Sequence, residues 1–130
     1  MRAFQYGLSV VAFALLTVAG CQRLNVEKTV DVDPAEIKGT VIDGPKSEQK
    51  IKVEFNSTAS PINVHVVLGK DDSKVIEELF KPAPKLDIRG KAEKSQSGTV
   101  EATIPAGQDY GVYLSGAKKK TQVSLKIKSQ

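Results

Sequence analysis

Side chains able to carry out chemistry are few and far apart in this sequence. Cys21 is the only cysteine and His65 is the only histidine. A hydrolytic site needs a nucleophile, a base and an acid that orients the base, and a zinc site needs several cysteine or histidine ligands. One histidine supplies neither set, so the sequence favours a protein that is not an enzyme and needs no metal ion or cofactor.

Two pairs of acidic residues are the remaining candidates for metal binding. Asp31 with Asp33, and Asp71 with Asp72, offer the carboxylate oxygens that calcium prefers. Neither pair has the spacing of a known calcium loop. A solvated strand edge explains the first pair and a helix cap explains the second, so calcium binding is the alternative interpretation.

The segment before Cys21 has the order of a secretory signal peptide. Arg2 supplies a positive charge, residues 8–19 are uncharged and mostly apolar, and Ala19 and Gly20 are small. The run of 12 residues would cover about 18 Å as a helix, which is too short for a hydrocarbon core of about 30 Å. Residues 1–20 are therefore predicted to be a signal peptide that is removed.

The four residues Val18-Ala19-Gly20-Cys21 resemble the lipobox of bacterial lipoproteins, which has an aliphatic residue, a small residue, Gly or Ala, and then Cys. The resemblance implies cleavage between Gly20 and Cys21 and a diacylglycerol on the Cys21 sulfur. It often implies a third acyl chain, such as palmitate, on the new amine. Two acyl chains anchor a protein stably, whereas one binds only marginally. The alternative is an ordinary signal peptide followed by a cysteine without lipid.

The same resemblance implies a location in the cell envelope. Membrane lipid would hold the chain through Cys21, with residues 21–23 as the tether. Gln22, in place of an Asp, favours the outer membrane facing the periplasm. Without the first 20 residues the chain has 18 basic and 15 acidic side chains and a net charge of +3. That excess is too small to indicate nucleic-acid binding, and it is compatible with a mild preference for anionic lipid.

Lysines provide two candidate surfaces for contact with anions. Lys118, Lys119 and Lys120 are consecutive, and such a run is usually a solvated hairpin tip. Because each lysine near an anionic membrane adds about 1 kcal/mol of attraction, the run is also a candidate for contact with lipid phosphates. The solvent face of residues 50–54 is the second candidate surface.

Short alternating runs of apolar and polar residues predict mostly β structure. In residues 50–55, Ile51, Val53 and Phe55 alternate with charged residues. Further runs lie at 24–32, 62–68, 100–104, 110–114 and 123–127, with shorter strands expected at 37–42 and 86–88. Residues 24–32 also fit an extended tether that contains valines.

One short helix is predicted near 72–80, because its apolar residues recur on one helical face. Asp71 or Asp72 can cap its start, and Pro82 stops it. Residues 91–97 are polar and are predicted to be a loop. The elements together predict an all-β fold, mainly an antiparallel β-sandwich, as a single domain over 24–130.

The end of the chain resembles bacterial pre-peptidase C-terminal domains. Ile104-Pro105-Ala106-Gly107 precedes a strand-like stretch at 110–116 and the strand at 123–127, and 63–72 is similar to the central strand and turn of those domains. The resemblance covers about half of the chain after Cys21. It lacks a Gly-Asp before the central strand and adds the helix near 72–80. It implies a β-sandwich that serves as a non-catalytic binding or targeting module.

The sequence therefore favours a membrane-anchored envelope lipoprotein that binds or holds another envelope component, with an envelope protein as a candidate partner. The alternative is a module for a small ligand, either carbohydrate or calcium. Sugar-binding modules usually stack sugars on exposed aromatic rings, and Tyr113 is the best candidate because Val112 and Leu114 should face inward. His65 is expected to be an exposed surface residue on its strand.

Overall fold

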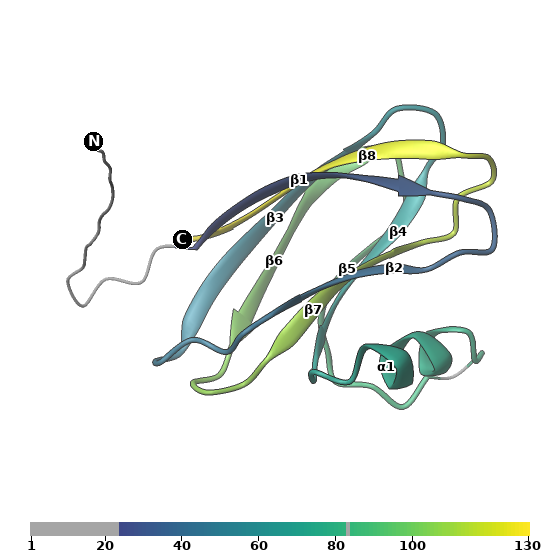
Figure 1. Ribbon diagram of the computed structural model, residues 1–130. Coiled ribbons are helices and arrows are strands. Elements are labelled where there is room, and N and C mark those ends of the chain that lie inside the picture. The colour runs from purple at the N-terminus through teal and green to yellow at the C-terminus, as the bar shows by residue number, and fades with distance from the viewer. Residues whose placement is uncertain (1–23, 83) are drawn as a thin grey trace, which may run out of the picture.

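The structure is a computed structural model that describes residues 24–82 and 84–130. Eight strands in this part of the chain form two four-stranded antiparallel sheets that pack face to face (Figure 1). Sheet A has the strand order β1-β8-β3-β6, and sheet B has the order β2-β7-β4-β5. One short helix, α1, is added to the sandwich. The predicted all-β sandwich with one short helix is confirmed.

The elements follow one another closely along the chain. Sheet A contains β1 (Asn25–Val32), β3 (Gln49–Ser57), β6 (Ser97–Ile104) and β8 (Thr121–Ser129). Sheet B contains β2 (Lys38–Ile42), β4 (Ile62–Leu68), β5 (Ile88–Ser95) and β7 (Tyr110–Ser115). Every connection except that from β4 to β5 crosses between the sheets, and this exception contains α1 (Asp72–Leu79).

Alternation along the strands builds the core between the sheets. In β3, Ile51 and Val53 are fully buried, whereas Lys50 and Lys52 point to solvent. The strand predicted at 24–32 is confirmed as β1, because it pairs with β8 from Asn25 to Val32. The main core combines residues from both sheets, including Val32, Phe55, Ile62, Val64, Val66, Ile104, Tyr110, Val112, Leu114, Val123, Leu125 and Ile127.

The loop predicted at 91–97 is wrong. This stretch belongs to β5 and β6, which are separated only by Gln96. Both are edge strands, so backbone hydrogen bonds to one neighbour hold them and few apolar side chains are needed. A bulge adds to the irregular pattern: Lys94 has a φ of 51°, and its N–H donates to Asn63 Oδ1 at 2.8 Å.

The helix starts where the sequence predicts a cap. Asp71 is the capping residue, and its carboxylate accepts a hydrogen bond from the Lys74 N–H at 3.2 Å. Val75 is the buried residue of α1 and faces sheet B. The helix therefore covers part of the outer face of sheet B, below the sandwich in Figure 1.

The sandwich has two distinct ends. At the end where β1 begins, which we call the N-terminal end, the Leu24 N–H donates to Ser129 Oγ and the Ser129 N–H donates to the Leu24 carbonyl, both at 3.1 Å. Residues 58–61 and 116–120 lie at the opposite, far end, where Thr121 starts β8 beside Val32. At about 3.4 Å per residue, the length of β8 from Thr121 to Ser129 separates the two ends by roughly 27 Å.

Candidate functional site

The predicted cleavage and lipidation site, Gly20 and Cys21, lies outside the described residues. The first described residue, Leu24, is held at the N-terminal end by Ser129. Three residue steps separate Cys21 from Leu24, and three steps of an extended chain span at most about 11 Å. The N-terminal end is thus the part of the sandwich that a lipid on Cys21 would hold near a membrane.

The three consecutive lysines lie at the far end. Lys118, Lys119 and Lys120 are exposed in the connection between β7 and β8. The first of them is fixed by its backbone, because its N–H donates to Ser60 Oγ at 3.0 Å. Their contact with anionic lipid stays a prediction, and the fold places them at the end opposite Leu24.

Buried hydroxyl groups join this lysine connection to the loop between β3 and β4. Ser57 Oγ donates to the Ser60 carbonyl at 2.6 Å, which leaves Thr121 Oγ1 as the donor to Ser57 Oγ, also at 2.6 Å. Thr121 Oγ1 in turn accepts from the Ala59 N–H at 2.9 Å. All three side chains, Ser57, Ser60 and Thr121, are buried. Their mutual hydrogen bonds therefore replace the hydrogen bonds that the hydroxyls would make to water in the unfolded chain.

Substitution of Thr121 by valine is expected to lower the free energy of unfolding by about 1–3 kcal/mol, because Ala59 N–H and Ser57 Oγ lose a buried partner. Chemical denaturation of the variant measures the loss. Ser124→Val is the matched control, since Ser124 is exposed on the same strand. We expect the control to change stability by less than about 0.5 kcal/mol. Equal losses in the two variants would contradict a role for the buried hydroxyl.

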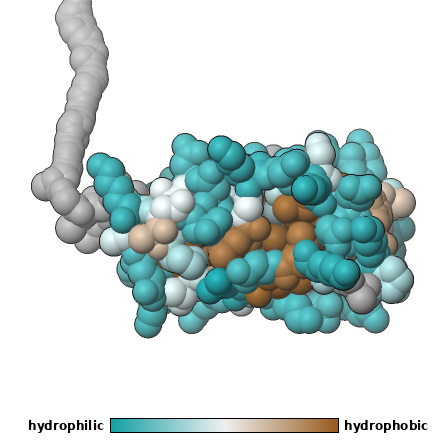
Figure 2. All heavy atoms as spheres, turned by 90° about the horizontal axis from the view of Figure 1, so that it is seen from below, coloured by the Kyte–Doolittle hydropathy of each residue, from teal (hydrophilic) through white to brown (hydrophobic). Residues whose placement is uncertain are grey.

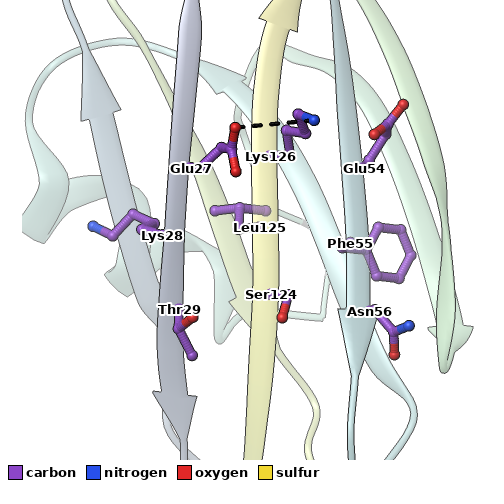
Figure 3. Close-up of a pocket in the computed structure, with 9 residues that line it drawn as sticks. All are labelled: Glu27, Lys28, Thr29, Glu54, Phe55, Asn56, Ser124, Leu125 and Lys126. Atoms are coloured by element: carbon purple, nitrogen blue, oxygen red, sulfur yellow. Dashed lines mark ion pairs between the residues drawn. The ribbon is translucent and has the colours of Figure 1, made fainter.

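A shallow groove of about 440 Å³ crosses the outer face of sheet A (Figure 3). Lys126 Nζ lies 3.9 Å from Glu27 Oε2 across the groove. Glu54, also in the groove, lies 3.3 Å from Lys128 Nζ. The Phe55 ring is only 4% exposed, so the groove offers charges, hydroxyls and an amide without a stacking surface. Lys50, Lys52 and Glu54 point outward on this face, as the alternation in residues 50–55 predicts.

Tyr113 does not serve as an exposed sugar platform, and that prediction is wrong. The side chain lies on the outer face of sheet B, as alternation predicts, yet it is 0% exposed. It packs against Val67 of β4 and Val75 of α1. Room for the ring comes from Gly39 and Gly111, because a Cβ on either would collide with it. The packing of α1 on the sheet helps to bury the ring.

The Tyr113 hydroxyl does not ionise readily. Burial raises the pKa of Tyr113 to about 12, and the nearby Asp72 carboxylate adds to the shift. The hydroxyl is therefore protonated and neutral at physiological pH. Neither the hydroxyl nor Asp72 Oδ1 completes a hydrogen bond of regular geometry within the described residues.

His65 lies on the same outer face of sheet B, opposite Tyr113 on β7 and Lys91 on β5. It is half-buried, whereas the sequence predicts an exposed residue. Burial lowers the pKa of His65, with Glu93 opposing and Lys91 reinforcing the shift. Its Nδ1 is buried without a hydrogen-bond partner. Within residues 24–82 and 84–130, no three His, Cys, Asp or Glu side chains gather to hold a metal ion.

Apolar side chains remain on the outer face of sheet B beside α1. Figure 2 views this side of the molecule and shows them gathered in the middle of the face, with hydrophilic side chains around them. Val41 is 42% exposed and Phe80, at the end of α1, is 61% exposed. We call the following residues the helix-side patch: Ile37, Val41, Ile76, Leu79, Phe80 and Leu86.

The sequence reasoning missed the helix-side patch. Its one signal is Val67, which places an apolar residue on the otherwise polar side of the 62–68 alternation. A contiguous apolar surface on a small domain commonly marks an interaction site.

Comparison with known proteins gives no relative: no family model matches the chain, and no curated protein matches it. In the described part of the chain, no helix is long and apolar enough to cross a membrane.

Proposed function

We propose that this chain is a non-catalytic lipoprotein of the bacterial cell envelope, anchored by lipid on Cys21, that binds another envelope protein. The lipobox-like residues 18–21 support the anchor. The helix-side patch carries the binding proposal, because Val41 and Phe80 stay exposed after the core is complete. Gln22 supports the outer membrane, with the domain facing the periplasm.

The surroundings of His65 support a binding role over an enzymatic one. In a hydrolytic triad an acid accepts the Nδ1 proton of the histidine and orients the ring. His65 Nδ1 has no such partner among the described residues, and the neighbouring Tyr113 hydroxyl is buried and protonated. The resemblance to pre-peptidase C-terminal domains, which are binding or targeting modules, points the same way.

Crosslinking in cells tests the proposal. Tagged, lipidated protein is crosslinked and its partners are identified by mass spectrometry, with Cys21→Ala as the unanchored control. We expect one dominant envelope protein in the wild type, and its loss in Cys21→Ala, because two acyl chains provide the stable attachment. Crosslinks to abundant neighbours alone would contradict a dedicated partner.

A pair of matched variants tests the patch itself. Val41→Asp places a charge within the helix-side patch and should abolish the dominant crosslink. Thr29→Asp introduces the same charge at an exposed residue of another edge strand, β1, and should keep it. An unchanged crosslink in Val41→Asp would remove the patch from the proposal.

The groove in Figure 3 supports a second candidate function, the binding of a small polar ligand such as a carbohydrate. Its hydroxyl, amide and charged side chains suit a polar molecule. A glycan array, together with melting temperatures in the presence and absence of calcium, tests this alternative. Binding that disappears in Glu54→Gln would favour it over a protein partner.

A further inference from the structure

Three lysines gather on the outer face of sheet A at the N-terminal end. Lys50 and Lys52 are two residues apart on β3 and point outward, because Ile51 and Val53 point into the core. Lys128 of β8 lies directly opposite Lys52. We call Lys50, Lys52 and Lys128 the lysine cluster.

Acidic neighbours compensate the lysine cluster only in part. Like charges directly opposite on antiparallel strands repel each other. Lys128 Nζ lies 3.3 Å from Glu54 Oε2. Glu101 of β6 lies opposite Lys52. Neither Lys50 nor Lys52 forms an ion pair within the described part of the chain. An excess of positive charge therefore remains exposed on these neighbouring strands.

The surface around Lys50 is hollowed and polar. Lys50 lies opposite Thr103 of β6 and lines a groove of about 380 Å³. Arg89, Glu101, Thr103 and Gln130 also line this groove, and Arg89 Nε lies 2.9 Å from Asp87 Oδ1. The groove offers the Lys50 ammonium and the Arg89 guanidinium to a phosphate group, with the Glu101 carboxylate beside them.

The lysine cluster lies beside the point where the chain leaves the sandwich toward Cys21. Asn25 pairs with Lys128, and the Gln130 N–H donates to the Lys50 carbonyl at 2.9 Å. Leu24 is at most about 11 Å from Cys21 along the chain. Lys118–Lys120 lie just beyond Thr121, which is roughly 24 Å from Lys128 along β8. That distance is about three times the Debye length of about 8 Å at physiological ionic strength.

We propose that the lysine cluster docks this end of sheet A onto the phosphates of anionic lipid headgroups. The proposal rests on the anchoring at Cys21 and assigns membrane contact to Lys50, Lys52 and Lys128 in place of Lys118–Lys120. In the docked orientation the N-terminal end of sheet A contacts the bilayer and the far end is tilted away from it. The helix-side patch, on the outer face of sheet B, then faces away from the bilayer and is open to a protein partner.

Depth measurements on the lipidated protein in vesicles test the orientation. Cys21 is the only cysteine, so once its sulfur carries lipid a fluorescent label goes only to an introduced thiol. Thr103→Cys reports on the outer face of sheet A beside Lys50, and Lys74→Cys reports on the exposed side of α1. A quencher on the lipid headgroups should reach the label at Thr103→Cys and not the one at Lys74→Cys when phosphatidylglycerol is present, and the difference should shrink at high salt.

Two triple variants in the Thr103→Cys background give a matched comparison. Lys50, Lys52 and Lys128 changed together to glutamine should reduce the docked-to-undocked ratio on the order of 100-fold, since each lysine contributes about fivefold. Lys118, Lys119 and Lys120 changed to glutamine remove the same charge and should leave the ratio unchanged. Circular dichroism confirms that both variants fold.

The outcomes separate this inference from the proposed function. Protein that floats with neutral vesicles but shows the same quenching at Thr103→Cys with and without phosphatidylglycerol would overturn docking and leave the anchor intact. A larger loss in the Lys118–Lys120 variant would also overturn it. Label on the Cys21 thiol would mean that the cysteine carries no lipid, which would overturn both proposals.

Discussion

Replacement of Tyr113 by alanine is expected to lower the free energy of unfolding by about 3–5 kcal/mol. The ring is 0% exposed and fills the space between sheet B and α1. Among the described residues, the ring forms a buried cluster with Val67 and Val75, and the other apolar residues around it are only partly buried. Loss of the ring therefore removes the largest fully buried side chain under the helix. Chemical denaturation measures the loss, and far-UV circular dichroism follows the helix.

Tyr113→Phe separates the ring from its hydroxyl. The hydroxyl is buried beside Asp72 and has no hydrogen-bond partner of regular geometry in the described structure. The Asp72 carboxylate beside the hydroxyl helps to raise the pKa of Tyr113, but no hydrogen bond of regular geometry joins the two groups. The phenylalanine variant should therefore lose no more than about 1 kcal/mol of stability. A phenylalanine variant as unstable as Tyr113→Ala would show that the hydroxyl, and not ring packing, holds α1.

Gly111→Ala is expected to destabilise the domain by about 1–3 kcal/mol, the usual range for an overpacked core. A Cβ at this position would lie 2.6 Å from Tyr113 Cε2 and 2.8 Å from its hydroxyl oxygen. Helix α1 limits the shift of the ring away from the sheet. Gly98→Ala on the edge strand β6 is the control. Its added Cβ would lie no closer than 3.3 Å to the Phe55 ring, so a shift of a few tenths of an ångström is enough.

The effect of Gly111→Ala should reverse when the ring is absent. The three atoms nearest to the added Cβ all belong to Tyr113. In the Tyr113→Ala background, alanine at position 111 should be neutral or stabilising by about 0.4–1 kcal/mol, because it restricts the unfolded chain. A double-mutant cycle measures this coupling. Additive effects of the two substitutions would contradict the proposed contact between the glycine and the ring.

The sequence by itself determined the elements whose side chains alternate around the core. Ile51, Val53 and Phe55 predict β3 because each turns the same face to the opposite sheet, and all three are buried. Asp71 predicts the start of α1 because a helix cap depends only on the next few residues. Local periodicity and local capping need no knowledge of distant residues, so these predictions hold.

The end of β5 and the start of β6 could not be read in the same way. Their stretch of residues 91–97 is polar, and the edge strands are held by backbone hydrogen bonds to β4 and β3. Backbone hydrogen bonds do not depend on which side chains are present, so this stretch lacks the alternation of apolar and polar residues. The sequence of the stretch therefore predicts a loop.

Tertiary packing alone decided the character of the two outer faces. Alternation places Tyr113 on the outer face of sheet B. Whether a side chain on that face is exposed to solvent depends on the packing of α1, which buries the Tyr113 ring and leaves Val41 exposed. Likewise, Lys118–Lys120 form a cluster in the sequence, whereas Lys52 and Lys128 meet only because β3 pairs with β8. The sequence determines on which face of a strand a side chain lies. The pairing of distant strands determines which other side chains it contacts there.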